Sequence, residues 1–339
     1  WRPDLRCMAD IAEEVARYYG YNRIATTAMR GTTTIGGYTD AEALENKACA
    51  AARALGYSEI ITYSFVSPTV FDNIRLPKDT PLRNAIRIIN PLGEDTSIMR
   101  TVILPSMLDI LARNHAYKNK GVKLYEMGRI YLPVEGRDLP DEPKRLIFGT
   151  YGEHEDFFSM KGEIDALLAA LNIPAATYVR SSDDPSYHPG RCAELRIGGQ
   201  KVGVLGQIHP LVAETYGIGA DVYCAELDFA LLQTMADGER VFHPLPKFPA
   251  VTRDLALVCD EAVTVGALEA CITASAGKLL RRIDLFDIYR GPGIEAGKKS
   301  VAFSLELRAD DRTLTDDDSV GVVNKVLEKL ESELHAKLR

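Results

Sequence analysis

Side chains that could hold single-stranded RNA gather in one short stretch near the carboxyl end of the sequence. Tyr289 lies on a predicted strand with Asp287 two residues earlier, so the two side chains share a face. The next predicted strand places three more polar side chains opposite them: Lys298, Lys299 and Ser300. An unstacked base can stack on a tyrosine ring for about 1 to 3 kcal/mol, while hydroxyl and carboxylate groups read base edges. A tyrosine that fills a sheet face beside solvated lysines gives the same pattern, and the residues alone favour that simpler interpretation.

Acidic residues near the start of the sequence could bind a hard cation. The set consists of Asp4, Asp10, Glu13 and Glu14. The last three occupy positions i, i+3 and i+4 of a helix predicted over Asp4 to Arg17, so they lie near one face. Carboxylate oxygens suit a Mg²⁺ ion that is held partly through waters or by a second chain. Acids near a helix start are also favoured by the helix dipole when they are simply solvated, and that alternative stays open.

The composition limits the class of protein. The length of 339 residues and the hydrophobic content of 46% predict two or three packed domains. Six cysteines without a CxxC pair indicate reduced thiols, and we expect no disulfide bridges. No apolar run reaches the roughly 18 residues that span a bilayer, which predicts a cytoplasmic location and no membrane partner. Because the net charge is -8, a nucleic-acid role needs a local basic patch; residues 278–299 hold six Lys or Arg against three acids.

The apolar periodicity predicts an α+β chain with a largely antiparallel sheet in its first part. A helix over Asp40 to Ala54 precedes a buried strand over Ile60 to Phe65. Further strands are predicted over Arg87 to Ile89, Lys123 to Tyr131, Leu146 to Tyr151, Ala193 to Ile197, Val202 to Gln207 and Val222 to Leu227, with helices near Pro105 to Tyr117 and Met160 to Leu171.

A proline-rich joint at 243–249 predicts a domain boundary. After the joint the elements follow the order β-α-β-β-α-β, which is the ferredoxin-like plan. They are predicted over Thr252 to Cys259, Val265 to Ala276, Leu280 to Tyr289, Lys299 to Arg308, Asp316 to Leu330 and a short terminal strand. Thr315 supplies a helix cap, and three aspartates follow it in the first turn.

Short sequence blocks throughout the chain resemble those of a known family. The last domain carries KFPAVTRD at 247–254, LFDIYRG at 285–291, GKKS at 297–300 and DRTL at 311–314. These blocks resemble the ferredoxin-fold anticodon-binding module of bacterial phenylalanyl-tRNA synthetase β subunits. Upstream, YEMGR at 125–129, HPGR at 188–191 and GQIHP at 206–210 resemble the synthetase-like domain of the same subunit. The opening WRPD at 1–4 and EEVAR at 13–17 resemble the end of its preceding domain.

The resemblance implies a domain organisation and a set of roles. Residues 1–30 would end a preceding domain, 38–240 would form a non-catalytic class II synthetase-like domain, and 246–339 would bind the tRNA anticodon. Tyr289 would stack on the first anticodon base, with Asp287 and Ser300 making polar contacts while Lys298 and Lys299 neutralise phosphate. A Mg²⁺ ion shared with the α subunit would lie at Asp4, Asp10, Glu13 and Glu14. The partners would be tRNA and the α subunit, in a heterotetramer of two α and two β chains.

No catalytic residue is expected in this chain. A class II enzyme holds the ATP α-phosphate with an arginine two residues before the glutamate of its second motif, whereas Leu124 precedes Glu126 at that spacing. The chain would therefore be an inactive scaffold within an ATP-dependent phenylalanine-tRNA ligase whose α subunit uses the ATP. Because it begins at Trp1 inside a helical pattern, we expect a part of a longer gene product. The alternative is a stand-alone RNA-binding or regulatory protein that reuses both domains.

Overall fold

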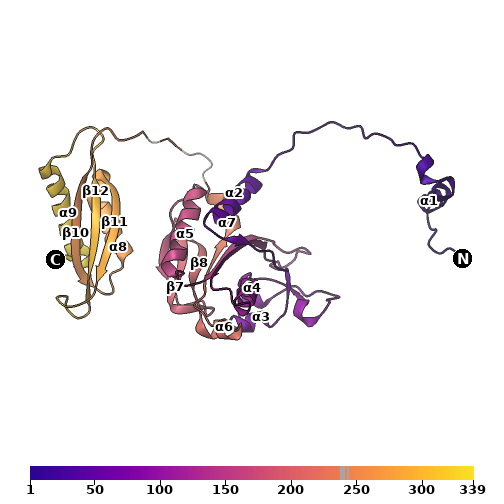
Figure 1. Cartoon of the computed structure of the whole chain (residues 1–339), viewed down its shortest axis with the longest axis horizontal. Helices are drawn as coiled ribbons and strands as arrows, with labels where there is room; N and C mark the ends of the chain where they lie inside the picture. The colour runs from indigo at the N-terminus through magenta and orange to yellow at the C-terminus, as the bar shows by residue number, and fades with distance from the viewer. Residues whose placement is uncertain (237–240, 243) are drawn as a thin grey trace. The chain divides into compact units, whose positions relative to one another are not determined.

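The structure is a computed structural model that describes residues 1–236, 241–242 and 244–339. The chain divides into two compact units, Trp1–Arg240 and Val241–Arg339 (Figure 1). The predicted end of the first large domain, at residue 240, and His243 of the predicted joint lie outside the described residues. Each unit has its own hydrophobic core.

A seven-stranded sheet organises the first unit. Its strands are β1 (Ser58–Glu59), β4 (Val122–Arg129), β5 (Lys144–Tyr151), β9 (Tyr223–Asp228), β8 (Gln200–Ile208), β7 (Tyr187–Ile197) and β6 (Thr177–Arg180), in that spatial order. Only the pairing of β1 with β4 is parallel, and the other neighbours pair antiparallel. The predicted α+β architecture with a largely antiparallel sheet is therefore confirmed. A separate two-stranded pair joins β2 (Phe65–Val66) to β3 (Ile98–Met99).

Helices cover both faces of this sheet (Figure 1). One core packs α2 (Asp40–Ala54), α5 (Phe157–Ala170) and α7 (Phe229–Met235) against side chains that include Tyr125 and Phe148. The opposite core packs α4 (Leu104–Ala116) and α6 (Pro210–Thr215) against Ile147 and Cys224, beside the short α3 (Val70–Asn73). Since successive strand residues point to opposite faces, the apolar runs of β5 and β9 supply both cores. The sheet is thus the rigid frame on which side chains of this unit are placed.

Two predicted strands of the first unit are wrong. Of the run from Ile60 to Phe65, only Phe65 joins a strand, and the side chains of Ile61 and Tyr63 are 90% and 84% exposed. Over Arg87 to Ile89 the chain makes one isolated bridge, from Arg87 to Ile98. Apolar β-branched and aromatic residues predicted burial, but no residue that the structure describes covers the outward side chains. A smaller difference is that α1 runs over Met8–Tyr19, so Asp4 precedes the helix.

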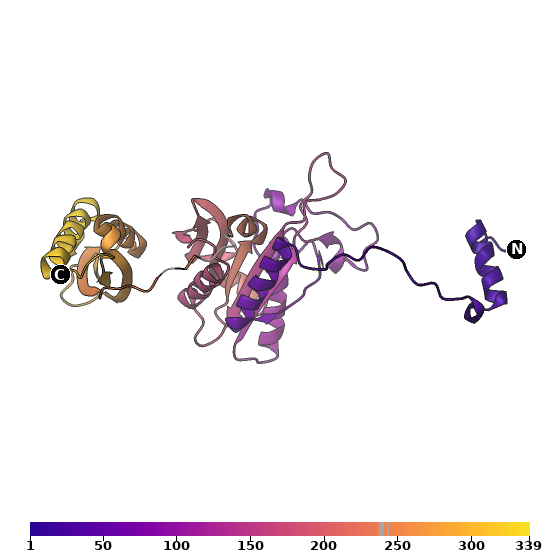
Figure 2. The same cartoon turned by 90° about the horizontal axis from the view of Figure 1, so that it is seen from above.

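The second unit has the predicted order of elements. It comprises β10 (Val251–Asp260), α8 (Val265–Ala276), β11 (Leu280–Tyr289), β12 (Lys298–Leu307), α9 (Asp316–Leu334) and β13 (Lys337–Leu338). The strands lie in the order β11-β12-β10-β13. Both helices pack on one sheet face, and Figure 2 shows them on the same side. The opposite face carries no helix of this unit among its described residues.

Local signals explain where the elements of the second unit begin. The Thr315 hydroxyl accepts a hydrogen bond from the Asp318 backbone N–H, and the Asp318 carboxylate accepts one from the Thr315 backbone N–H, so the predicted cap is a full capping box. Strand β11 is an edge strand whose register against β12 shifts twice, near Leu280 and near Leu285.

Four short 3₁₀ turns complete the described chain: Tyr21–Arg23, Pro81–Arg83, Glu94–Thr96 and Gly277–Leu279. In the described part of the chain, no helix has both the length and the apolar character of a membrane span.

Candidate nucleic-acid interface

The helix-free face of the second unit gathers three of the predicted RNA-binding side chains. Strand register places Tyr289 of β11 opposite Ser300 of β12, and Asp287 opposite Ala302. Because their in-between neighbours Ile288 and Val301 also pair with each other, the alternation puts Asp287, Tyr289 and Ser300 on one face. Asp287 is exposed and Tyr289 is half-buried, whereas Ser300 is only 3% exposed. An aromatic ring, a carboxylate and a hydroxyl therefore lie together, as the sequence predicted.

The two predicted lysines take opposite faces. Lys298 shares the face of Ser300, and its ammonium lies 2.6 Å from the Glu295 carboxylate, a hydrogen bond that raises the pKa of Lys298. Lys299 is 6% exposed, and its Nζ donates a hydrogen bond to the Glu261 carbonyl oxygen at 3.0 Å. The expectation that both lysines lie beside Tyr289 is thus corrected, because adjacent strand residues alternate. Lys299 instead fixes the turn that follows β10.

Arg339 also reaches this face, and sequence reasoning missed it. Its guanidinium lies over the Tyr289 ring, 5.4 Å from the ring centroid, and the Tyr289 hydroxyl donates to the Pro292 carbonyl at 3.2 Å. The Arg339 backbone N–H is anchored at 2.8 Å on the Ala256 carbonyl, next to β13. Since β13 and β11 form opposite edges of the sheet, the two side chains together span the strands between them. A two-residue strand gives no periodic signal, so the sequence did not reveal this contact.

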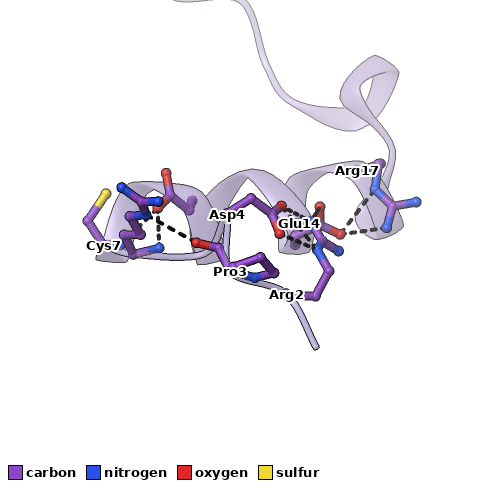
Figure 3. Close-up of polar contacts among 8 residues, drawn as sticks. Arg2, Pro3, Asp4, Cys7, Glu14 and Arg17 are labelled. Atoms are coloured by element: carbon purple, nitrogen blue, oxygen red, sulfur yellow. Dashed lines mark hydrogen bonds and ion pairs between the residues drawn. The ribbon is translucent and has the colours of Figure 1, made fainter.

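Two of the four predicted metal ligands, Asp4 and Glu14, bind the same arginine side chain of their own chain. The Arg2 guanidinium donates to Asp4 at 2.7 Å and to Glu14 at 2.9 Å, and Arg17 donates to Glu14 at 2.5 Å (Figure 3). The hydrogen bond from Arg2 is the main cause that lowers the pKa of both carboxyls. Both groups are therefore ionised near neutral pH and already converge on a positive charge.

Asp10 and Glu13 are used differently. The Asp10 carboxylate accepts hydrogen bonds from the backbone N–H groups of Arg6 at 2.6 Å and Cys7 at 2.8 Å, which lowers its pKa and completes the start of α1. Glu13 is exposed. Within the described ranges, no three His, Cys, Asp or Glu side chains are placed to hold a metal together. The carboxylates of Asp4 and Glu14 are suitable ligands for Mg²⁺. The remaining ligands would have to come from waters or a second chain.

In the first unit, the glutamate of the predicted motif belongs to a buried polar cluster. Glu126 and Arg100 are each 3% exposed, and Arg100 Nη2 lies 3.0 Å from Glu126 Oε1. The Thr62 hydroxyl donates to Glu126 Oε2 at 2.7 Å, and Arg100 Nε donates to the Arg129 carbonyl at 2.8 Å. Leu124 is buried in the core beneath α4. Both carboxylate oxygens of Glu126 are therefore satisfied by the protein itself.

An apolar row near this cluster faces solvent. Ile61, Tyr63 and Phe65 alternate along an extended segment and are 90%, 84% and 45% exposed. Alternation puts their side chains on one side of the segment, while Ile60 and Thr62 face the unit. A row of three apolar side chains on the outward side of one segment is typical of a surface that another protein covers.

The second unit belongs to a known class of tRNA-binding domain. Its residues 246–339 match the family model described as "Ferredoxin-fold anticodon binding domain". Residues 24–229 match the model described as "Phenylalanyl tRNA synthetase beta chain CLM domain". The chain therefore belongs to the phenylalanyl-tRNA synthetase β chain family, as its sequence blocks predicted.

Curated relatives match the whole chain. The phenylalanine-tRNA ligase β subunits of Clostridium tetani and Clostridium acetobutylicum are 43% and 40% identical to it, and that of Symbiobacterium thermophilum is 39% identical. Each alignment covers 100% of this chain but only 43%, 43% and 39% of the relative, so the chain spans less than half of their length. Among solved structures, the pyrrolysyl-tRNA synthetase of Desulfitobacterium hafniense is 16% identical with a TM-score of 0.48, over 57% of this chain and 67% of that one; this likeness is too slight to support an argument.

Proposed function

We propose that this chain is the carboxy-terminal part of a phenylalanine-tRNA ligase β subunit, which acts in the cytoplasm as a scaffold and binds the tRNA anticodon. Its relatives carry that name over the full length of the chain. The observation that carries the RNA-binding part of the proposal is the helix-free sheet face on which Asp287, Tyr289 and Ser300 lie together. Residues 1–30, 38–240 and 246–339 are its proposed domains, the second with a class II synthetase-like fold.

On this face, Tyr289 would stack on the first anticodon base while Asp287 and Ser300 contact base edges. Lys298 shares this face and would meet phosphate in place of Glu295, whereas Lys299 supports the turn through Glu261. The Arg339 guanidinium lies over the Tyr289 ring, so a base would stack on that side of the ring only after the Arg339 side chain leaves it. Binding in this proposal therefore includes the movement of one exposed arginine.

Catalysis is assigned to the α subunit, which would bind ATP and phenylalanine. Leu124 offers no charge to an ATP phosphate, and Glu126 is fully engaged by Arg100 and Thr62. This chain alone should therefore give no phenylalanine-dependent exchange between ATP and pyrophosphate. Exchange activity in the purified chain would contradict the assignment.

The exposed row of Ile61, Tyr63 and Phe65, together with α2, is the proposed docking surface for the α subunit in an assembly of two α and two β chains. The test is light scattering on a sizing column after this chain is mixed with an α subunit from a close relative. A stoichiometric complex is the expected result. A chain that binds tRNA but no α subunit would favour a stand-alone RNA-binding protein instead.

Within that assay, Tyr63→Asp should weaken the complex by about thirtyfold or more, because loss of a central interface aromatic costs about 2 kcal/mol or more. Val179→Asp is the control, since Val179 is 46% exposed on β6, at the edge of the seven-stranded sheet opposite to β1. Equal affinity of both variants would place the α subunit elsewhere on this chain.

A Mg²⁺ ion shared with the α subunit is proposed at the acidic segment, with Asp4 and Glu14 as its nearest ligands in place of Arg2. Asp10 and Glu13 would contribute from α1 through bridging waters. The ion would supply positive charge that holds the two chains together.

In calorimetric titrations of Mg²⁺ into the α complex, the double variant Asp4→Asn, Glu14→Gln should lose one binding event. Asp317→Asn, at the exposed start of α9, should keep it. Binding that is unchanged in the double variant would rule these ligands out.

A further inference from the structure

A cavity of about 360 Å³ opens on the sheet face that α4 covers. Strand register puts Ile147, Glu226 and Val204 in one row across β5, β9 and β8, and the cavity lies at this row. Its apolar wall comes from Ile74, Leu76, Leu82, Val102 and Leu104. The volume is within the range of small-molecule sites, and the mixture of an apolar wall with a few polar groups is typical of them.

Two buried hydrogen-bond donors line this cavity without an acceptor. Tyr187 is 2% exposed, and its hydroxyl has no partner in the described part of the chain. The same holds for Nε of Arg145, although another nitrogen of that guanidinium pairs with Asp228. Buried polar atoms are nearly always paired, and an unmade hydrogen bond costs about 1 to 3 kcal/mol. Each of the two donors therefore needs an acceptor that the described part of the protein does not supply.

An acceptor without a donor faces the same space. No described residue donates a hydrogen bond to the Glu226 carboxylate. Burial raises the pKa of Glu226 to about 7, while the nearby Arg145 charge acts in the opposite direction. A carboxylate on an apolar cavity wall is stabilised when a positive group pairs with it.

The charges around the cavity do not balance. Asp184, Glu226 and Asp228 oppose Arg145 and Lys201, which leaves one negative charge when all are ionised. Asp228 is paired with Arg145. Lys201 lies 2.8 Å from Glu194, which draws it away from Glu226. Two lining carboxylates are then left without an ion pair: Asp184, which accepts the Ser186 backbone N–H at 2.9 Å, and Glu226.

We propose that this cavity binds a small amphiphilic monocation that carries an ammonium group for Glu226, a carbonyl oxygen for the Tyr187 hydroxyl and Arg145 Nε–H, and a short aliphatic body for the apolar wall. Amides of aliphatic amino acids combine these three features in one compact molecule. The site is separate from the RNA-binding face and from the exposed row at Tyr63, so it stands or falls independently of the proposed function.

The test is calorimetric titration of the 339-residue chain with L-leucinamide. Two probes each lack one feature: 4-methylpentanamide has no amine, and isoamylamine has no carbonyl. L-leucine adds a negative charge. L-leucinamide should bind with one-to-one stoichiometry and about tenfold or more tightly than any of the other three, since a hydrogen bond to a charged group is worth about tenfold or more. Absence of binding at millimolar L-leucinamide, or equal binding of 4-methylpentanamide, would overturn the proposal and leave the cavity to water.

Variants locate the site. Glu226→Gln keeps the shape of the side chain and should weaken L-leucinamide binding about tenfold or more, and Tyr187→Phe should weaken it about threefold to tenfold. Tyr216→Phe is the matched control, because Tyr216 lines a different cavity. Unchanged affinity in Glu226→Gln would contradict the assignment. If that variant fails to fold, the four probes on the unmodified chain still decide the outcome.

Discussion

Replacing Arg100 with leucine should lower the free energy of unfolding of the first unit by about 3 to 5 kcal/mol. Arg100 and Glu126 form an ion pair at 3.0 Å in which both side chains are almost fully buried. Removal of the guanidinium would leave a carboxylate in the interior with only Thr62 as a side-chain donor. An uncompensated buried charge is far more costly than the loss of a surface ion pair.

Urea unfolding followed by circular dichroism gives the measurement, since a change in midpoint at constant slope reports stability. The double variant Arg100→Leu, Glu126→Leu should recover most of the loss, because two apolar residues can replace a buried pair at little cost. Arg87→Leu serves as the control, because Arg87 belongs to the same unit but is exposed. A loss below about 1 kcal/mol in the single variant would mean that water reaches Glu126.

Replacing Tyr289 with alanine should weaken tRNA binding by about 1 to 3 kcal/mol, which is roughly a fivefold to 150-fold rise in Kd. On the helix-free face, the strand register places the Tyr289 ring beside Asp287 and Ser300. Within the described part of the second unit, no other aromatic ring is placed there by the register. The measurement is a tRNA binding isotherm with the assembled α and full-length β subunits. Salt must be matched, since phosphate contacts make the affinity depend on ionic strength.

Two further variants separate stacking from damage to the fold. Tyr289→Phe keeps the ring and should retain most of the affinity, although it loses the hydrogen bond to the Pro292 carbonyl. Val320→Ala lies on α9 at an exposed position, on the helix side of the sheet, and should bind tRNA normally. If Tyr289→Ala binds with wild-type affinity at matched salt, Tyr289 has no stacking role.

Local sequence signals were sufficient for the second unit. The order and approximate bounds of its elements followed from periodicity and turn residues, and the Thr315 cap depends only on Asp318, three residues away. Strand alternation also placed Tyr289 and Asp287 on one face. The same rule, applied strictly to β12, would have separated Lys299 from Lys298, since adjacent residues point apart.

Long-range contacts explain what the sequence did not reveal. Arg100 and Glu126 are 26 residues apart, and Arg339 meets Tyr289 only because β13 closes one edge of the sheet. The run Ile60 to Phe65 has the composition of a buried strand. Whether it is buried, however, depends on which other parts of the fold pack against it. The position of Asp4 depended on a helix boundary, which is the least reliable part of a prediction from periodicity.

The long edge strand β11 affects how this chain behaves at high concentration. Ten residues at a sheet edge, with Leu285, Phe286 and Ile288 exposed, offer a row of free backbone groups to a strand of another molecule. Its two register shifts interrupt that row, and a bulged strand twists away from flat pairing. Arg281 and Arg282 at its start, each in an ion pair with an aspartate, put charged groups on this edge, which disfavours pairing with another strand. Substitutions that straighten β11 would therefore favour aggregation even where they leave every core contact intact.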